Sequence, residues 1–341
     1  MLCGLVRHRS DASVLSPLVA PCEPARLRLG SRHRGGNVRG RAQSQRPPPR
    51  STLRQRTHRR GAAQGGATLG VASRPRGRAG VIDAALLAAA AREAGLAPVS
   101  AVVERIDRPG ERAELDPELE LYPASMIKVP IAVAALARVE AGALTLGQDV
   151  AVDERNLTAN DAPSPMRAGY RATLGELIDL MLSRSDNVAT NQLIDLLGRE
   201  AITRHCRSIG LTRTAVRRKL SGSLPLIADP EANGRNAHPA GDAAALFAAL
   251  DARRLPGALV VLGALARQYW TGKLPLGLRP GDRFAHKTGD TDEVSHDGGI
   301  LTLADGRRYV VVLYTGATSP DTDPRFGTWM ARVRAGLGEN S

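Results

Sequence analysis

Two of the four lysines in this 341-residue chain stand close to a hydroxyl side chain, in segments that suggest catalytic chemistry. Lys128 follows Ser125 by three residues in a stretch that is typical of a helix, so the two side chains would share one helical face. Serine is a weak nucleophile until a base removes its proton, and a buried lysine with a lowered pKa can be that base. The pair therefore predicts an activated serine, although a helix N-cap beside a surface lysine would show the same pattern.

Two later segments carry residues that would complete such a site. The Ser-Asp-Asn segment from Ser185 to Asn187 lies between two expected helices, where the hydroxyl can relay a proton to a leaving group and the amide can hold the substrate or the lysine. Lys287 and Thr288 end an expected strand, where they can hold a substrate carboxylate, and Gly289 lets the backbone come close. The simpler interpretations are a second N-cap and a protected edge strand.

Taken together and in this order, the three segments resemble the signature of the class A β-lactamases and penicillin-binding proteins. The separations agree with it, at 60 residues from Ser125 to Ser185 and 102 residues from Ser185 to Lys287. The sequence around the motifs is also similar to that family, and the chain is identified as a member of the class A β-lactamase-like serine hydrolases over residues 81–341. The stretches that carry this similarity are 122–129, 174–191 and 296–300.

The resemblance implies hydrolysis of a β-lactam through an acyl-enzyme, with no metal or other cofactor. Ser125 would attack the lactam carbonyl with help from Lys128, and Ser185 would pass a proton to the lactam nitrogen. The backbone N–H groups of Ser125 and Asp290 would hold the oxyanion. The implied partner is a small β-lactam or a peptidoglycan-like molecule, bound to a monomer that needs no other protein. The implied substrate-binding residues are Asn187, Lys287, Thr288 and Gly289.

The sequence departs from the family pattern at two positions. Class A enzymes activate the deacylating water with a glutamate in a loop after the Ser-Asp-Asn segment, and alignment through residues 210–218 places Leu220 there. Asp229 and Glu231 lie in a string that resembles the family's Glu-Pro-x-x-Asn loop. Either of them is a candidate to replace the missing glutamate as the deacylation base. Asp290 stands where small residues are usual, and its carboxylate would oppose an oxyanion or an anionic substrate. These departures predict acylation followed by slow turnover.

Two other functions remain open on the sequence alone. The missing glutamate favours a D-Ala-D-Ala carboxypeptidase-like or esterase-like enzyme on the same scaffold, which activity on a D-Ala-D-Ala peptide against a penicillin would distinguish. A catalytically silent domain with a nucleic-acid-binding tail is the second alternative. Because all three motifs are intact, we do not expect nucleic acid as a partner.

The net charge of +13 comes from one end of the chain. Residues 1–80 hold 17 arginines, no lysine and two acidic residues, so their net charge is +15 and that of the remainder is −2. This segment has no apolar periodicity, and we expect a disordered tail or a start site placed too far upstream. The resemblance implies a periplasmic or secreted enzyme, but residues 14–20, the best candidate for a signal core, are interrupted by serine and proline. No apolar run reaches the roughly 18 residues that a membrane helix needs.

The elements that must position these motifs predict an α+β fold. Strands expected early and late in the chain would complete one five-stranded antiparallel sheet, with the first and last helices packed on it and an all-helical part at about 125–270 inserted between. Cys206, the lone cysteine of residues 81–341, is expected on a helix with its side chain in the hydrophobic core. The histidines of the same residues show no metal-ligand spacing. The expected strands are 99–106, 111–119, 283–288, 295–303 and 308–315. The expected helices are 81–96, 125–140, one capped by Thr173 and Glu176, 186–197, 199–208, 241–253, 257–268 and 324–337.

Overall fold

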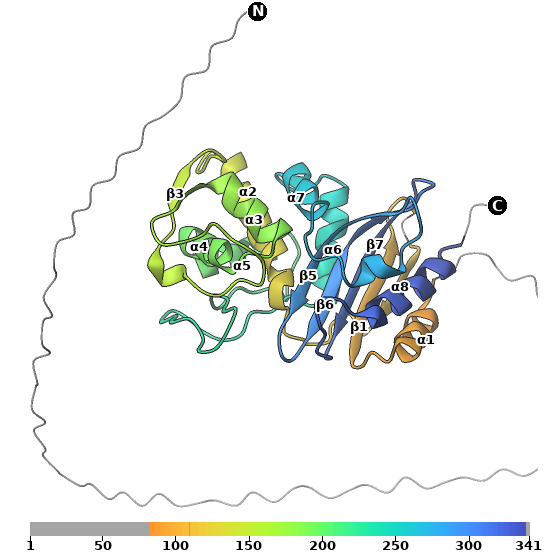
Figure 1. Ribbon diagram of the computed structural model, residues 1–341. Coiled ribbons are helices and arrows are strands. Elements are labelled where there is room, and N and C mark those ends of the chain that lie inside the picture. Colours follow the sequence, from red (N-terminus) through yellow and green to blue (C-terminus); the bar gives the residue numbers. More distant parts are fainter. Residues whose placement is uncertain (1–81, 109, 339–341) are drawn as a thin grey trace, which may run out of the picture. The chain divides into compact units, whose positions relative to one another are not determined.

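Five antiparallel strands from both ends of the described chain form one sheet (Figure 1). The computed structural model describes residues 82–108 and 110–338, so the expectation for residues 1–80 lies outside the described residues. The order β2-β1-β7-β6-β5 places an early strand beside the last one, and Val99 of β1 is opposite Thr315 of β7. The α+β prediction with one five-stranded antiparallel sheet is thus confirmed. The strands are β1 (Val99–Arg105), β2 (Arg112–Leu115), β5 (Arg283–Asp290), β6 (Ser295–Thr302) and β7 (Arg308–Thr315).

Helices cover both faces of the sheet, which explains the nearly continuous apolar runs in β1 and β7. Alternate residues along a strand point to opposite faces. Ala101 and Val103 join a cluster with Trp329 of α8 (Pro324–Gly336), whereas Val102 joins the core on the other face, to which α6 (Ala240–Asp251) contributes. The first helix, α1 (Ala84–Ala94), packs beside α8 in the first cluster.

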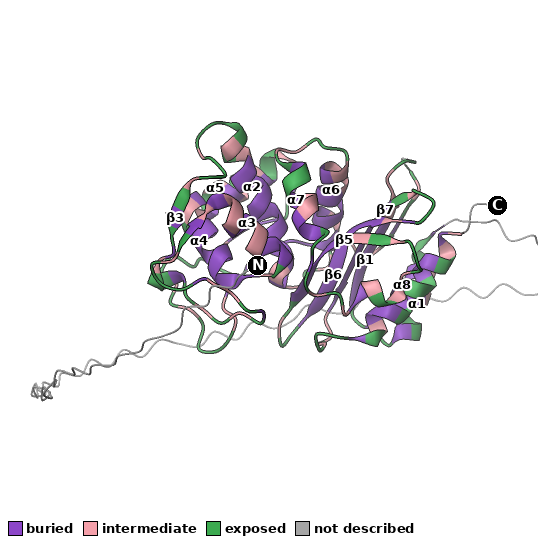
Figure 2. Cartoon of the chain, turned by 45° about the horizontal axis from the view of Figure 1, so that its top comes forward, coloured by how far each residue is buried: buried purple, intermediate pink, exposed green. Residues whose placement is uncertain are grey.

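The remaining helices form the larger core around α2 (Lys128–Glu140). Figure 2 shows α2 and α4 buried along most of their lengths. Cys206 is buried in this region, as expected. No helix in the described ranges is long and apolar enough to cross a membrane. The other helices here are α3 (Leu174–Ser183), α4 (Asn187–Leu197), α5 (Arg199–Ser208) and α7 (Ala258–Leu265).

Several local predictions differ from the structure. The helix expected to begin at Ser125 opens with a 3₁₀ turn, η1 (Ala124–Ile127), and the strand expected to end at residue 288 continues to Asp290. Thr173 caps α3, but the carboxylate of Glu176 accepts a hydrogen bond from the Tyr170 hydroxyl (2.8 Å), which replaces the second half of a capping box. Four short elements were not expected because three or four residues show no periodicity: β3 (Asp149–Ala151), η2 (Glu154–Asn156), β4 (Arg171–Thr173) and η3 (Leu274–Gly277).

Candidate active site

Lys128 brings the first two motifs together. It stands at the start of α2, inside the larger core, and its side chain is fully buried. Its Nζ lies 3.0 Å from Ser185 Oγ, 2.8 Å from Asn187 Oδ1 and 2.5 Å from the Ser185 carbonyl oxygen. These oxygen atoms replace the water that a surface lysine would bind. The interpretation of Lys128 as a surface residue is therefore wrong, and its amine is in contact with the hydroxyl of the second motif.

Burial lowers the pKa of Lys128 well below its ordinary value, and the nearby positive charge of Lys287 lowers it further. The carboxylates of Asp186 and Asp161 oppose this change by favouring the charged form. A lower pKa increases the fraction of neutral amine, which is the form that accepts a proton. Lys128 thus has the electrostatic environment of a general base.

Asp186 caps α4, so the neighbouring Ser185 hydroxyl is available to accept a hydrogen bond from Lys128. The Asp186 carboxylate accepts a hydrogen bond from Ala189 N (2.8 Å) at the start of α4 and another from Asn160 Nδ2 (3.1 Å). Asn160 Oδ1 in turn accepts from the backbone N–H of Asn187 at 2.6 Å. The N-cap interpretation therefore holds for Asp186, and the Ser185 hydroxyl is left for the lysine.

Two residues of the site have left-handed backbone conformations that disfavour side chains. Ala124, directly before Ser125, has φ +47°, and Ser185 has φ +62°. Such a conformation costs a residue other than glycine about 1–2 kcal/mol and persists where the surrounding structure enforces it. Here it accompanies the turns that deliver Ser125 and Ser185 to the site, and no motif in the sequence signals it.

The third motif runs beside Ser125 on the edge strand β5. A methyl group placed on Gly289 would lie 3.0 Å from the backbone nitrogen of Ser125 and 3.1 Å from the Pro123 carbonyl oxygen. Glycine thus permits the close approach of the two backbones that the sequence suggested. Thr288 and Lys287 precede it on the strand and are buried.

Lys287, on β5, is a second fully buried lysine. Burial lowers its pKa to about 7, and the charge of Lys273 acts in the same direction, whereas Asp290 and Asp297 raise the value. Its Nζ donates to the carbonyl oxygen of Thr288 at 2.8 Å. An anion that binds beside Lys287 would favour its charged form.

A cavity of about 630 Å³ opens over Ser125 and Asn187. Leu220 also lines it, and both backbone groups of this residue are held by the side chain of Asn191, at 2.8 Å from Leu220 N and 2.9 Å from Leu220 O. Leu220, an apolar residue, thus lines the same cavity as Ser125 and also joins the larger core. The charged residues in the lining are Asp161, Arg218, Lys219, Arg235, Asp290, Asp292, Glu293 and Asp321.

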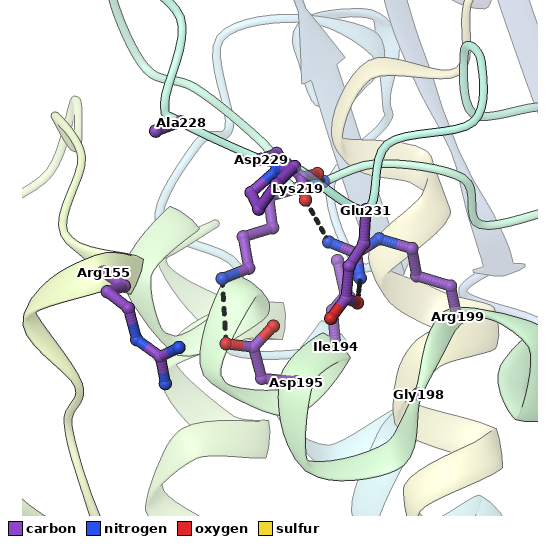
Figure 3. A pocket seen from close by; sticks show the side chains of 10 residues that line it. Arg155, Ile194, Asp195, Gly198, Arg199, Lys219, Ala228, Asp229 and Glu231 are labelled. Atoms are coloured by element: carbon purple, nitrogen blue, oxygen red, sulfur yellow. Dashed lines mark hydrogen bonds and ion pairs between the residues drawn. The ribbon is translucent and has the colours of Figure 1, made fainter.

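Asp229 and Glu231, the possible substitutes for a glutamate base, line a different pocket (Figure 3). Both carboxylates bind the guanidinium of Arg199, at the start of α5. Asp229 is buried and also accepts from the backbone N–H of Lys219 at 2.6 Å, whereas Glu231 is exposed. The structure therefore does not bring either residue to Ser125, because Arg199 holds both of them elsewhere.

Asp290 lies beside Ser125 as expected, but its charge has a partner that sequence reasoning missed. The buried ammonium group of Lys273 binds its carboxylate, and Ser295 Oγ donates to the same oxygen atom at 2.7 Å. The carboxylate expected beside the oxyanion region thus has a buried positive partner. The signal that could have found Lys273 is the scarcity of lysine in the chain.

No group of three or more histidine, cysteine or acidic side chains is placed to hold a metal ion in residues 82–108 and 110–338. The arrangement offers acid–base and nucleophilic chemistry instead: a serine, a buried lysine, a second hydroxyl and backbone N–H groups at a strand edge.

Comparison with known proteins gives one family. The model described as "Beta-lactamase enzyme family" matches residues 83–333. A β-lactamase of Rhodobacter capsulatus is 41% identical over 87 residues, which are 25% of this chain and 30% of that protein. The extended-spectrum β-lactamase PER-1 of Pseudomonas aeruginosa is 28% identical over 205 residues, 56% of this chain and 66% of the relative. The alignments thus span less than two thirds of these curated relatives.

Among solved structures, PBP-A superposes with a TM-score of 0.65 at 24% identity, over 75% of this chain and 97% of that chain. This likeness is one of fold. It extends over nearly the whole of the solved protein.

The Arg199 network yields the first testable prediction. Asp229→Asn removes the negative charge of a buried ion pair and leaves the buried Arg199 without its buried counter-charge. The free energy of unfolding should therefore fall by about 3 kcal/mol. Glu231→Gln is the matched control, because this exposed partner of the same guanidinium should cost less than about 1 kcal/mol. Urea unfolding of both variants measures the difference. Loss of turnover in Asp229→Asn with unchanged stability would show instead that the carboxylate is a catalytic base.

Proposed function

The chain belongs to the beta-lactamase enzyme family, and from this premise we propose that it is a serine hydrolase that opens β-lactam amides through an acyl-enzyme on Ser125. The observation that carries the proposal is the buried Nζ of Lys128, in contact with the Ser185 hydroxyl and the Asn187 amide oxygen, three residues along the chain from Ser125. The amine and the Ser185 hydroxyl form a path for the proton that acyl transfer must move, and the Asn187 amide oxygen orients the amine.

In the proposed acylation, neutral Lys128 accepts the proton of Ser125 while the serine oxygen forms a bond to the lactam carbonyl carbon. The carbonyl oxygen becomes an anion between the backbone N–H groups of Ser125 and Asp290. The bond between carbon and nitrogen then breaks, and Ser185 donates its proton to the leaving nitrogen. Lys128 returns the proton to Ser185 across their 3.0 Å contact, so that no charge is left over.

We propose that the substrate lies along β5, with its carboxylate near Lys287 and Thr288 and its backbone-like amide beside Gly289. Asn187 has a divided role. Its Oδ1 accepts from Lys128, and one hydrogen atom of Nδ2 is donated to the Ala159 carbonyl oxygen at 3.0 Å. The second Nδ2 hydrogen is the one that we assign to the acyl side chain of the substrate.

Deacylation is the step at which we expect this enzyme to be slow. Hydrolysis of the acyl-enzyme needs a base that activates water, and Leu220 supplies none. The same observation favours a second candidate function, a carboxypeptidase-like or esterase-like hydrolase that uses the same serine on another acyl donor. In either case we propose a small molecule or a short peptide as the substrate and the periplasm or the cell exterior as the compartment, and the family membership supports both proposals.

Replacement of the nucleophile gives the second prediction. Ser125→Ala should abolish any covalent adduct with penicillin G or a chromogenic cephalosporin, because no oxygen is left to form the ester, while the wild type should accumulate the adduct. Intact-mass spectrometry with parallel absorbance kinetics measures both. Ser208→Ala, at the end of α5, is the control and should react like the wild type. Fast turnover of the wild type with no detectable adduct would contradict slow deacylation.

The lowered pKa of Lys128 gives the third prediction. Since only the neutral amine accepts a proton, the acylation rate at saturating substrate, where loss of charge on Lys287 does not limit binding, should fall as the pH drops through this lowered pKa and not rise further around the pKa of free lysine, about 10.4. Burial of the amine sets the pH at which the rate falls, and the charges of Lys287, Asp186 and Asp161 adjust it. Adduct formation followed by rapid quenching from about pH 5 to about pH 10 tests this. A rate that keeps rising up to the pKa of free lysine would rule out Lys128 as the buried base.

The fourth prediction concerns Leu220, the apolar residue that lines the cavity. Leu220→Glu introduces a carboxylate at the position where the resemblance implies a water-activating base, and we expect deacylation to accelerate at least about tenfold. Leu220→Gln is the matched control, since it has a similar shape and no basic oxygen. The decay of the isolated acyl-enzyme, followed by intact mass, is the measurement. Equal decay of the two variants would show that the position does not face the ester.

A further inference from the structure

Asp290 creates an electrostatic conflict in the proposed reaction. Its backbone N–H is assigned to the oxyanion, yet the same residue carries a negative charge in a cavity wall next to Ser125. Like charges at short range in a partly desolvated site oppose one another strongly. A free carboxylate here would disfavour the transition state, which has one more negative charge on the substrate than the ground state.

Lys273 supplies the counter-charge to Asp290 at the end of the edge strand β5. It stands directly before η3, only 1% of its surface is exposed, and its Nζ binds the Asp290 carboxylate. Its ammonium group also lies 5.5 Å from the ring centre of Phe326 on α8, on the side that faces away from solvent. The lysine is thus fixed from two directions.

The neighbouring strand completes the arrangement. Ser295 of β6 is the register partner of Asp290, and its hydroxyl donates to the same carboxylate oxygen, Oδ1, that Lys273 binds. The carboxylate is therefore held by a full positive charge and a hydroxyl donor, while two-fifths of its side chain remains exposed toward the cavity. A fixed and neutralised carboxylate leaves the backbone N–H of Asp290 as the main polar feature of this residue for a substrate.

We propose that Lys273 is a positioning residue that neutralises and fixes Asp290 beside the oxyanion, and that it thereby sets the rate of acylation. This inference rests on the proposed function. It explains why an acidic residue is tolerated after the Lys-Thr-Gly motif, and it predicts that the two side chains act as one unit. Loss of the lysine alone should impair the reaction more than loss of both charges.

The test is a double-mutant cycle with Lys273→Met, Asp290→Asn and the combined variant, measured by the second-order rate of acylation with penicillin G. We expect Lys273→Met to lower this rate at least about tenfold, mainly through the acylation step and less through substrate binding. Adding Asp290→Asn to Lys273→Met should recover most of that loss. Lys273→Arg, which keeps the charge, should stay closer to the wild type than the methionine variant.

A matched control separates electrostatics from general destabilisation. Arg334 on α8 forms another buried ion pair, with Asp282, in which the side chains are 7% and 0% exposed. Arg334→Met should lower the unfolding midpoint but leave the acylation rate unchanged. Thermal unfolding of each variant shows whether a loss of rate only follows a loss of stability.

The outcomes are distinct for the two hypotheses. Strictly additive losses in the cycle, or a rate for Lys273→Met equal to that of the wild type, would overturn the role of Lys273 while leaving the acyl-enzyme proposal intact. Rescue by Asp290→Asn supports it, because a purely structural role of the lysine would not be rescued by removing its partner's charge. A wild type that forms no adduct with penicillin G would overturn the proposed function and this inference together.

Discussion

The site depends on the burial of one amine. With its Nζ cut off from water, Lys128 must find all of its hydrogen-bond partners in the protein, and Ser185 and Asn187 provide them. This requirement dictates the local structure around it. Ser185 adopts a left-handed backbone conformation so that both its carbonyl and hydroxyl oxygen atoms reach the amine, and Asp186 takes over the capping of α4. The contacts that we propose for catalysis are therefore the same contacts that satisfy the buried amine.

The use of lysine in this chain follows the same principle. All four lysines are buried, Lys128 and Lys287 completely, whereas the 43 arginines include many surface ion pairs. An ammonium group responds to burial by a lower pKa, while a guanidinium stays charged. Lys128 and Lys287 show that response, and Lys273 and Lys219 are paired with the carboxylates of Asp290 and Asp195. The protein thus reserves lysine for places where proton affinity or a compact buried charge is required.

The sequence was informative where the signal is local or periodic. Helix and strand positions followed from apolar patterns and caps, and the order of the three motifs predicted which residues would meet. The pairings across long distances were not predictable, because no local pattern relates Lys273 to Asp290 or Arg199 to Asp229. Asp229 shows the consequence: its sequence context suggested a base, and only the fold reveals that a buried arginine binds it.

At Leu220, the contacts that hold the backbone are distinct from the side chain that the proposed chemistry would use. The side chain of Asn191 holds both backbone groups of Leu220, so these two hydrogen bonds do not depend on which side chain the residue carries. Leu220 itself is 6% exposed and joins the larger core. In the proposed reaction, acylation would depend on Lys128 in the helical core, whereas water activation would need a base in the loop that Asn191 holds. The two halves of the proposed reaction therefore rest on different elements of one scaffold.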